Sequence, residues 1–202
     1  LDKFPKSILI VGGGYIACEF ASIFSNLGTE VTQLIRGQSL LNGFDEDLSS
    51  CLKESPTYTE INLIYNTQLK SIKEVNGDLE STLDSGDKIL TNNILIATGR
   101  EPNLLPLNLD FLNLKMDGKY LYVDHLNQTS NANIFAVGDI TNRPNLTPVA
   151  IEQGRVFSDN FFNNQKRKVN YENIPKAVFT IPEISTVGLS EERAKVIRSE
   201  EH

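Results

Sequence analysis

The segment from Lys6 to Phe20, KSILIVGGGYIACEF, decides the fold, because an apolar run leads directly into three glycines. The continuous apolar run over residues 8–11 predicts a strand covered on both faces, as in a parallel sheet. From Tyr15 onward, large apolar residues recur every three or four positions and predict an amphipathic helix that stops at Gly28. These residues are Ile16, Phe20, Ile23, Phe24 and Leu27. A strand, a glycine turn and a helix in this order open a βαβ unit.

The next segments extend this unit into an α/β domain. Residues 30–35 predict a second strand, and an acidic first turn predicts a helix from Asp45. Residues 62–66 and 69–91 alternate in polarity around Asn-Gly and Ser-Gly turns, so we expect an antiparallel meander inserted in the domain. Residues 92–100 predict a further buried strand that ends in a glycine.

Beyond Arg100 the composition changes. Residues 101–118 are rich in proline, asparagine and leucine, which is typical of a linker. Residues 119–124 and 133–139 predict two strands, and a helix is expected from Pro148 to Phe162. Residues 174–195 predict a strand, a turn and the start of a helix.

Composition and charge exclude several classes of function. The chain has 202 residues and a net charge of -7, without the basic surface that nucleic acid or an anionic membrane attracts. It has no apolar stretch near the ~20 residues that span a bilayer. The cysteines, Cys18 and Cys51, are not arranged as C-x-x-C, and the two histidines have no metal-ligand spacing. We therefore expect a cytoplasmic protein with no metal site, no membrane partner and no nucleic-acid partner.

The three glycines match the dinucleotide pattern G-x-G-x-x-[GA] at Gly12, Gly14 and Ala17. In this pattern the first glycine permits the tight turn, the second lets the backbone approach the pyrophosphate, and the third small residue lets helix and strand pack closely. The helix N-terminus directs free N–H groups and a positive dipole end at the phosphates. The motif indicates nucleotide binding; the alternative is a tight strand–helix turn without a ligand.

The end of the second strand bears on the choice of cofactor. An NAD site usually carries Asp or Glu about 20 residues after the glycines. This chain has Ile35 and Arg36 there, and a guanidinium suits the 2′-phosphate of NADP. Arg36 therefore favours NADPH, although arginines after surface strands are common.

Four collinear motifs carry a family resemblance: GGGYIACEFASIF, ATGREPN, ANIFAVGDITNRPNLTPVAIEQGR and IPKAVFTIPEISTVGLSEE. Together they resemble the flavin-dependent disulfide reductases, in particular the glutathione reductase family. The resemblance implies a Rossmann-like NAD(P)H-binding domain in residues 1–100 and the second half of an FAD-binding domain in 101–170. Residues 171–202 would begin a dimerisation (interface) domain. The chain would thus be an internal fragment of a class I pyridine nucleotide-disulfide oxidoreductase.

The resemblance also implies a reaction. The full-length parent would be a homodimer that passes a hydride from NADPH to FAD and then reduces glutathione disulfide through a C-x-x-x-x-C cysteine pair. Neither Cys18 nor Cys51 matches that pair, and no histidine matches the acid–base position. No catalytic residue is therefore expected in this chain, which should not turn over alone.

Several cofactor contacts are implied residue by residue. Tyr15 matches a lid tyrosine over the nicotinamide, and its neighbour Ile16 is assigned to the same site. Glu19 matches a carboxylate that pairs with a lysine of the missing FAD half, so we expect it to be solvated here. Gly99 and Arg100 match the ATGR loop that lines the cofactor site.

Three further roles concern flavin and substrate. Asp139 matches an acceptor for the flavin ribityl chain, and Thr147 matches the start of a helix that faces the flavin pyrimidine. Arg155 matches an arginine that binds a glutathione carboxylate. The family often has a second 2′-phosphate arginine where this chain has Asn42, which weakens the NADPH prediction. The alternatives are a fragment of an NADH-using dihydrolipoamide dehydrogenase and a non-catalytic nucleotide-binding module.

Overall fold

The computed structural model describes residues 3–107 and 109–199. The chain divides into two compact units, one formed by Leu1–Gly99 with Pro175–His202 and the other by Arg100–Ile174. Each unit has its own buried apolar cluster, so each is held together by its own core.

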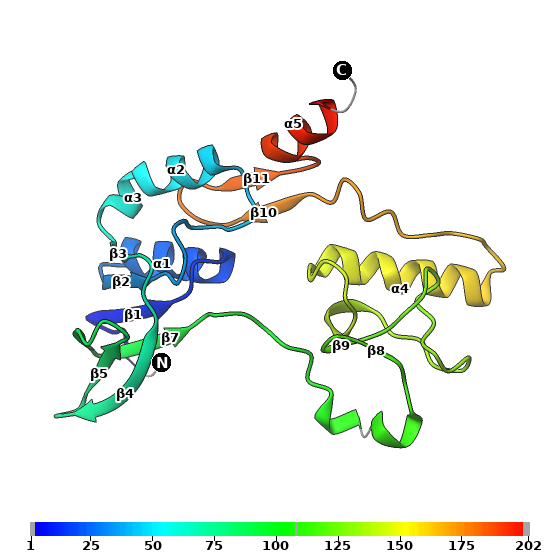
Figure 1. Ribbon diagram of the computed structural model, residues 1–202, viewed down its shortest axis with the longest axis horizontal. Coiled ribbons are helices and arrows are strands. Elements are labelled where there is room, and N and C mark those ends of the chain that lie inside the picture. The colour runs from blue at the N-terminus through cyan, green and yellow to red at the C-terminus, as the bar shows by residue number, and fades with distance from the viewer. Residues whose placement is uncertain (1–2, 108, 200–202) are drawn as a thin grey trace. The chain divides into compact units, whose positions relative to one another are not determined.

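The first unit is built on a four-stranded parallel sheet (Figure 1). Its strands are β1 (Ser7–Val11), β2 (Glu30–Leu34), β3 (Asn62–Ile64) and β7 (Asn93–Ile96), in the order β3-β2-β1-β7. The predicted strands at 8–11, 30–35 and 92–100 are confirmed. The assignment of residues 62–66 to the meander is wrong, because β3 pairs with β2 in parallel.

Helices pack on one face of this sheet. α1 (Tyr15–Asn26), α2 (Glu46–Glu54) and α3 (Pro56–Thr59) share a core with Ile8 and Ile10 of β1. The helices predicted from Tyr15 and Asp45 are therefore confirmed, but the packing of α1 differs from its apolar pattern. Its buried residues are mostly small, whereas Phe20, Ile23 and Leu27 are exposed. Small side chains let the helix axis approach the sheet closely, and Phe24 is the large side chain of the pattern that is buried with them.

An antiparallel sheet covers the other face of the parallel sheet. Its strands are β4 (Leu69–Val75), β5 (Asp78–Leu83) and β6 (Lys88–Thr91), in the order β4-β5-β6. Leu83 and partly buried Leu69 and Ile89 form a second cluster with Leu9 and Val11. Because alternate residues of β1 enter opposite cores, all four of its apolar residues are buried, which explains the unbroken apolar run.

The C-terminal segment of the first unit is a hairpin followed by a helix. β10 (Lys176–Val178) pairs antiparallel with β11 (Ile184–Thr186), and α5 (Glu191–Ser199) follows. Residues 174–195 thus contain two strands where one was expected. Val178 and Ile184 are buried in the same core cluster as the buried residues of α1. The assignment of residues 171–202 to an interface domain stays a prediction, since compactness does not test family domain boundaries.

The second unit has little regular sheet. It contains the short pair β8 (Met116–Asp117) and β9 (Tyr120–Leu121) and the long helix α4 (Thr147–Phe162). The single-turn 3-10 helices η1 (Leu105–Leu107), η2 (Leu109–Leu112) and η3 (Gly138–Ile140) complete it. The helix predicted from Pro148 is confirmed. The strand predicted at 133–139 is wrong: Phe135 makes an isolated bridge to Gln128, and Gly138, at φ 77°, turns the chain into η3.

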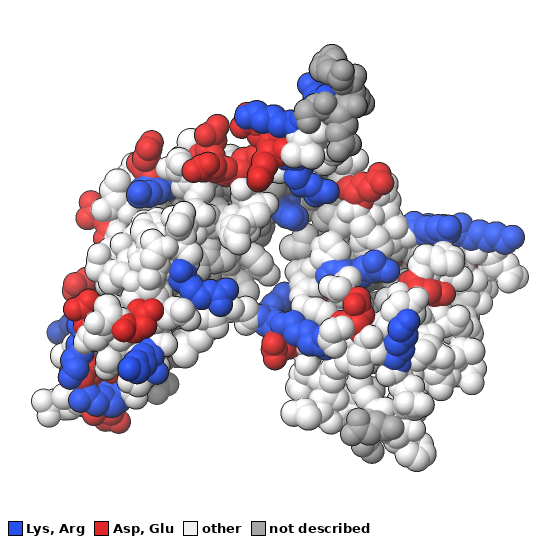
Figure 2. Space-filling view, viewed as in Figure 1, with Lys and Arg blue, Asp and Glu red and all other residues white. Residues whose placement is uncertain are grey.

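The helices and the surface charges bear on contact with a membrane. Within the part of the chain that the structure describes, no helix is both long and apolar enough to cross a membrane. Over the antiparallel sheet, basic and acidic side chains interleave, as Figure 2 shows, and Glu80 pairs with Lys73 and Lys88. Charges of both signs therefore alternate on this sheet.

Candidate functional site

The glycine turn between β1 and α1 fits tightly against neighbouring backbone. Gly12 has φ 142°, and a Cβ atom placed on it would lie 2.4 Å from the carbonyl oxygen of Ala97, just after β7. The same atom would lie 3.3 Å from Cβ of Ala17, which is fully buried. Gly12 is thus required by the approach of β7 as well as by the turn, and Ala17 by the close contact of α1 with β1.

The N-terminus of α1 is open where a phosphate would lie. Gly14 is the N-cap, no side chain among the described residues caps the helix, and its first turn carries no acidic residue. A Cβ atom on Gly14 would meet no atom of the described residues within 4 Å. Free N–H groups and the positive end of the helix dipole therefore face unfilled space, which fits the pyrophosphate of a dinucleotide. Tyr15 begins the helix half-exposed, and Ile16 is half-buried behind it.

Hydrogen bonds from two other segments hold the backbone of the turn. The Gly12 amide donates to Leu34 O at 2.9 Å, and the Leu41 amide donates to Gly13 O at 2.7 Å. The side-chain amide of Gln33, which is fully buried in β2, donates to Gly12 O at 2.9 Å. Sequence reasoning missed Gln33, although a glutamine between apolar residues of a buried strand was a usable signal.

Arg36 and Gly99 follow the carboxyl ends of the strands on either side of β1. β1, β2 and β7 run parallel, so their carboxyl ends meet at one edge of the sheet, together with the glycine turn. Arg36 is exposed and makes no hydrogen bond or ion pair with any residue within 3–107 and 109–199. Its guanidinium is therefore available to an anion. Asn42, also exposed, supplies no positive charge.

Glu19 is not simply solvated, contrary to our expectation. Its carboxylate accepts a hydrogen bond of 3.0 Å from the backbone amide of Phe179, and one turn later the Ser22 hydroxyl accepts one of 3.0 Å from Ile181. Helix α1 therefore holds the segment between β10 and β11 by two peptide groups. The hairpin was predicted as an element, but its contact with Glu19 could not be read from sequence positions 160 residues apart.

The buried thiol and phenol beneath the turn stay neutral. Burial raises the pKa of the Cys18 thiol, and burial also raises the pKa of Tyr58, whose hydroxyl donates to Cys18 O at 3.0 Å. A protonated, enclosed thiol is a poor nucleophile. Cys18 is therefore a packing residue of this site.

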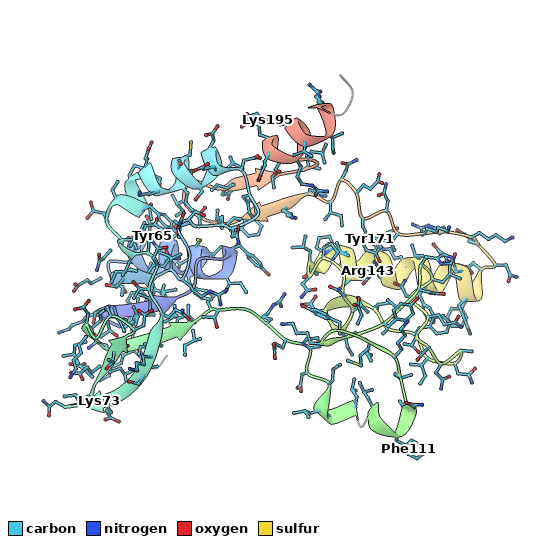
Figure 3. The ribbon with its side chains drawn as sticks, viewed as in Figure 1. Tyr65, Lys73, Phe111, Arg143, Tyr171 and Lys195 are labelled. Carbon is cyan, nitrogen blue, oxygen red and sulfur yellow. The ribbon has the colours of Figure 1, made fainter. Side chains whose placement is uncertain are left out.

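In the second unit, Arg100 and Asp139 lie together. Arg100 Nη2 is 2.8 Å from Asp139 Oδ2, and both side chains are about half exposed. Gly138, just before Asp139, donates its amide to Gln153 Oε1 at 2.6 Å, and Gln153 donates to the Tyr171 hydroxyl at 3.0 Å. The Arg143 guanidinium lies over the Tyr171 ring, 5.0 Å from its centroid (Figure 3). The turn that carries Asp139 is thus anchored to α4.

Two other predicted residues of this unit lie on α4. Thr147 is its first residue, exposed, at an N-terminus that no side chain caps. Arg155 is exposed and pairs with no acidic side chain in the described ranges. An open helix end beside Asp139 fits an electron-rich or anionic group, as predicted for flavin.

The chain is similar in sequence to one family of known proteins. The family model described as pyridine nucleotide-disulphide oxidoreductase matches residues 1–154. The chain is 42% identical over 192 residues to a glutathione reductase of Burkholderia cepacia, with 95% of this chain and 43% of that protein aligned. It is 36% identical over 201 residues to a mercuric reductase of Staphylococcus aureus, covering 96% of this chain and 36% of that protein.

Solved structures give the same result. The HOCl-induced flavoprotein disulfide reductase RclA of Escherichia coli superposes with a TM-score of 0.91 at 28% identity, covering 97% of this chain and 45% of that chain. LpdA of Mycobacterium tuberculosis superposes with a TM-score of 0.89 at 28% identity, covering 99% of this chain and 43% of that chain. The α/β fold is thus that of flavoprotein disulfide reductases, and the chain spans less than half the length of these relatives.

Proposed function

The chain belongs to the pyridine nucleotide-disulphide oxidoreductase family, and from this premise we propose that residues 1–100 form a Rossmann-like domain, with an inserted meander, that binds NADPH. The observation that carries the proposal is the open N-terminus of α1 at Gly14, at the same sheet edge as Arg36, which pairs with none of the residues that the structure describes. The first binds a pyrophosphate through backbone N–H groups, and the second binds a 2′-phosphate through its guanidinium.

The remaining predicted residues take supporting roles. Tyr15 covers the nicotinamide end, with Ile16 and Ala17 packed behind it, and Gly99 leaves space beside the turn. Glu19, whose carboxylate accepts a hydrogen bond from the Phe179 amide, would pair with the lysine of the FAD half that the resemblance implies. FAD would supply the acceptor for the hydride, and Asp139 with the N-terminus of α4 would hold part of it.

For the whole protein we propose an NADPH-dependent glutathione-disulfide reductase. Relatives with that name align over nearly the whole chain, and Arg155 on α4 is free to bind a substrate carboxylate. The redox cysteine pair and the acid–base histidine would lie in other parts of the protein, so this chain alone should not reduce disulfides. A homodimer, a cytoplasmic location and the interface-domain role of residues 171–202 stay predictions of the same proposal.

Calorimetric titration with NADPH and NADH at one low ionic strength tests the proposal. We expect NADPH to bind at least about tenfold more tightly, and Arg36→Ala to remove that difference, because one charge-assisted contact contributes about 1.5–3 kcal/mol. A preference for NADH would favour an NADH-using dihydrolipoamide dehydrogenase, and equal affinities for the two nucleotides would refute the NADPH assignment. No binding of either one would refute the nucleotide site.

A further inference from the structure

We infer that Gln33 is a positioning residue that fixes the glycine turn for dinucleotide binding. Its side chain extends from the middle of β2 beneath the turn and donates to Gly12 O at 2.9 Å. The inference rests on the proposed function, because it concerns the same pyrophosphate site.

The two amide hydrogens of Gln33 account for its placement. Besides Gly12 O, Nε2 lies 3.7 Å from the Cys18 sulfur, and that thiol lies 3.8 Å from Gly13 O. Gln33 thus reaches the turn directly at Gly12 and indirectly, through Cys18 of α1, at Gly13. The opposite orientation of the amide would place its oxygen against the Gly12 carbonyl oxygen, which repels it.

The acceptor side of the same amide shows that this residue is not there for stability alone. Gln33 is fully buried, and its Oε1 accepts no hydrogen bond from any of the described residues. A buried oxygen without a donor destabilises the fold, and an apolar residue of similar shape would avoid that cost. The benefit that offsets this destabilisation is the fixed position of the Gly12 carbonyl.

A fixed Gly12 carbonyl matters because the turn that begins at Gly12 leads directly into α1. Two residues later the Gly14 N-cap starts this helix, whose free N–H groups would meet the pyrophosphate. If the peptide plane at Gly12 could rotate, the N-terminus of α1 could shift relative to β1. Gln33 therefore acts on the shared pyrophosphate contact of NADPH and NADH and not on the 2′-phosphate contact of Arg36.

The test uses Gln33→Met and Gln33→Leu in this chain, titrated with NADPH, NADH and adenosine 2′-monophosphate. Methionine keeps the length without a donor, and leucine is a shorter apolar side chain that also has no donor. Thr29→Val is the matched control, since Thr29 is a buried residue just before β2 that donates to Pro5 O at 2.9 Å, at the other end of the strands.

We expect both Gln33 variants to weaken NADPH and NADH by about three- to tenfold each with the ratio between them unchanged, corresponding to one hydrogen bond. Adenosine 2′-monophosphate, which has no pyrophosphate, should bind within about twofold of the unmodified chain, and Thr29→Val should change none of the three. Unchanged dinucleotide affinity, or equal weakening of all three ligands, would overturn the inference.

Amide hydrogen exchange without ligand separates this inference from the proposed function. Loss of the Gln33 donor should speed exchange at the Gly12 amide, which donates to Leu34 O, and at the Leu41 amide, which donates to Gly13 O; Thr29→Val should not. Slow exchange at both amides in the Gln33 variants would show that the turn does not depend on Gln33. If the unmodified chain bound neither nucleotide, the proposed function would fail, and the exchange result would still decide whether Gln33 holds the turn.

Discussion

Arg100 and Asp139, which the family resemblance placed in two separate motifs, form an ion pair with each other at 2.8 Å. Arg100 was expected in the loop that lines the cofactor site, and Asp139 was expected to accept from the flavin ribityl chain. Both belong to the unit formed by Arg100–Ile174, whereas Gly99 is the last residue of the first segment of the other unit. The residues of the ATGR motif are therefore divided between the two units at the bond between Gly99 and Arg100.

This pairing predicts a small stability effect. Because both side chains are about half exposed, a double-mutant cycle with Arg100→Ala and Asp139→Asn should give a coupling of about 0.2–1 kcal/mol in urea unfolding. The coupling should fall as salt is added, because ions screen an exposed pair. A coupling above about 2 kcal/mol would show a more enclosed pair than this geometry allows.

The glycine turn predicts opposite outcomes for two neighbouring substitutions. Gly12→Ala should destabilise the chain by more than about 2 kcal/mol, since its Cβ would collide with Ala97 O at a positive φ. Gly14→Ala should leave stability within about 0.5 kcal/mol, because its φ is -82° and its Cβ meets open space. Thermal unfolding measures both.

Titration of the Gly14→Ala variant with NADPH tests whether the pyrophosphate binds at this turn. The Cβ of Gly14→Ala would occupy the space in which a pyrophosphate is expected, so NADPH affinity should fall at least about tenfold. Unchanged affinity in a folded Gly14→Ala variant would place the phosphate elsewhere.

The two hydrogen bonds from α1 predict how the β10–β11 segment is held. Glu19→Ala and Ser22→Ala should each speed amide exchange, at Phe179 and Ile181 respectively, by about two- to tenfold, in line with one hydrogen bond of about 0.5–1.5 kcal/mol. Glu19→Gln keeps the accepting oxygen and should restore slow exchange at Phe179. Equal exchange rates in all variants would show that the core residues Val178 and Ile184 alone hold the segment.

The sequence predicted those parts of the fold whose signals are local. The strand at 8–11, the glycine turn and the helices from Tyr15, Asp45 and Pro148 follow from apolar periodicity, turn residues and helix starts. The failures depend on tertiary contacts. Residues 62–66 alternate like the meander, but Asn62–Ile64 pair with β2. Phe20, Ile23 and Leu27 of the predicted apolar pattern are exposed, because the core takes mostly the small residues of α1.

The candidate site shows the same difference between local signals, which the sequence reveals, and tertiary contacts, which it does not. Gly12, Gly14 and Arg36 could be named because their roles depend on spacing along the chain. The roles of Gln33 and of the Phe179 amide depend on which atoms meet after folding, at sequence separations of 21 and 160 residues. The Arg100–Asp139 pair likewise joins two motifs that the sequence presents as separate.

A last prediction concerns acid stability and the antiparallel sheet, where Lys73 of β4 is labelled in Figure 3. Hydrogen bonds from Lys73, and then from Lys88, hold the pKa of the Glu80 carboxyl below its usual value of 4.5. A carboxyl whose pKa is lower in the folded chain stabilises the fold above its unfolded pKa and loses that contribution as the pH falls through the folded pKa. Glu80→Gln should therefore lower stability at pH 7.

The difference between Glu80→Gln and the unmodified chain should narrow as the pH falls below about 4.5 and disappear once Glu80 is protonated in both states. Urea unfolding from pH 7 down to the acid limit of folding measures this convergence. High salt should reduce the difference at pH 7, because Glu80 contacts two exposed lysines at 3.0 Å and 3.1 Å. A difference that stayed constant with pH would mean that Glu80 acts by packing, since a packing effect does not depend on whether its carboxyl is ionised.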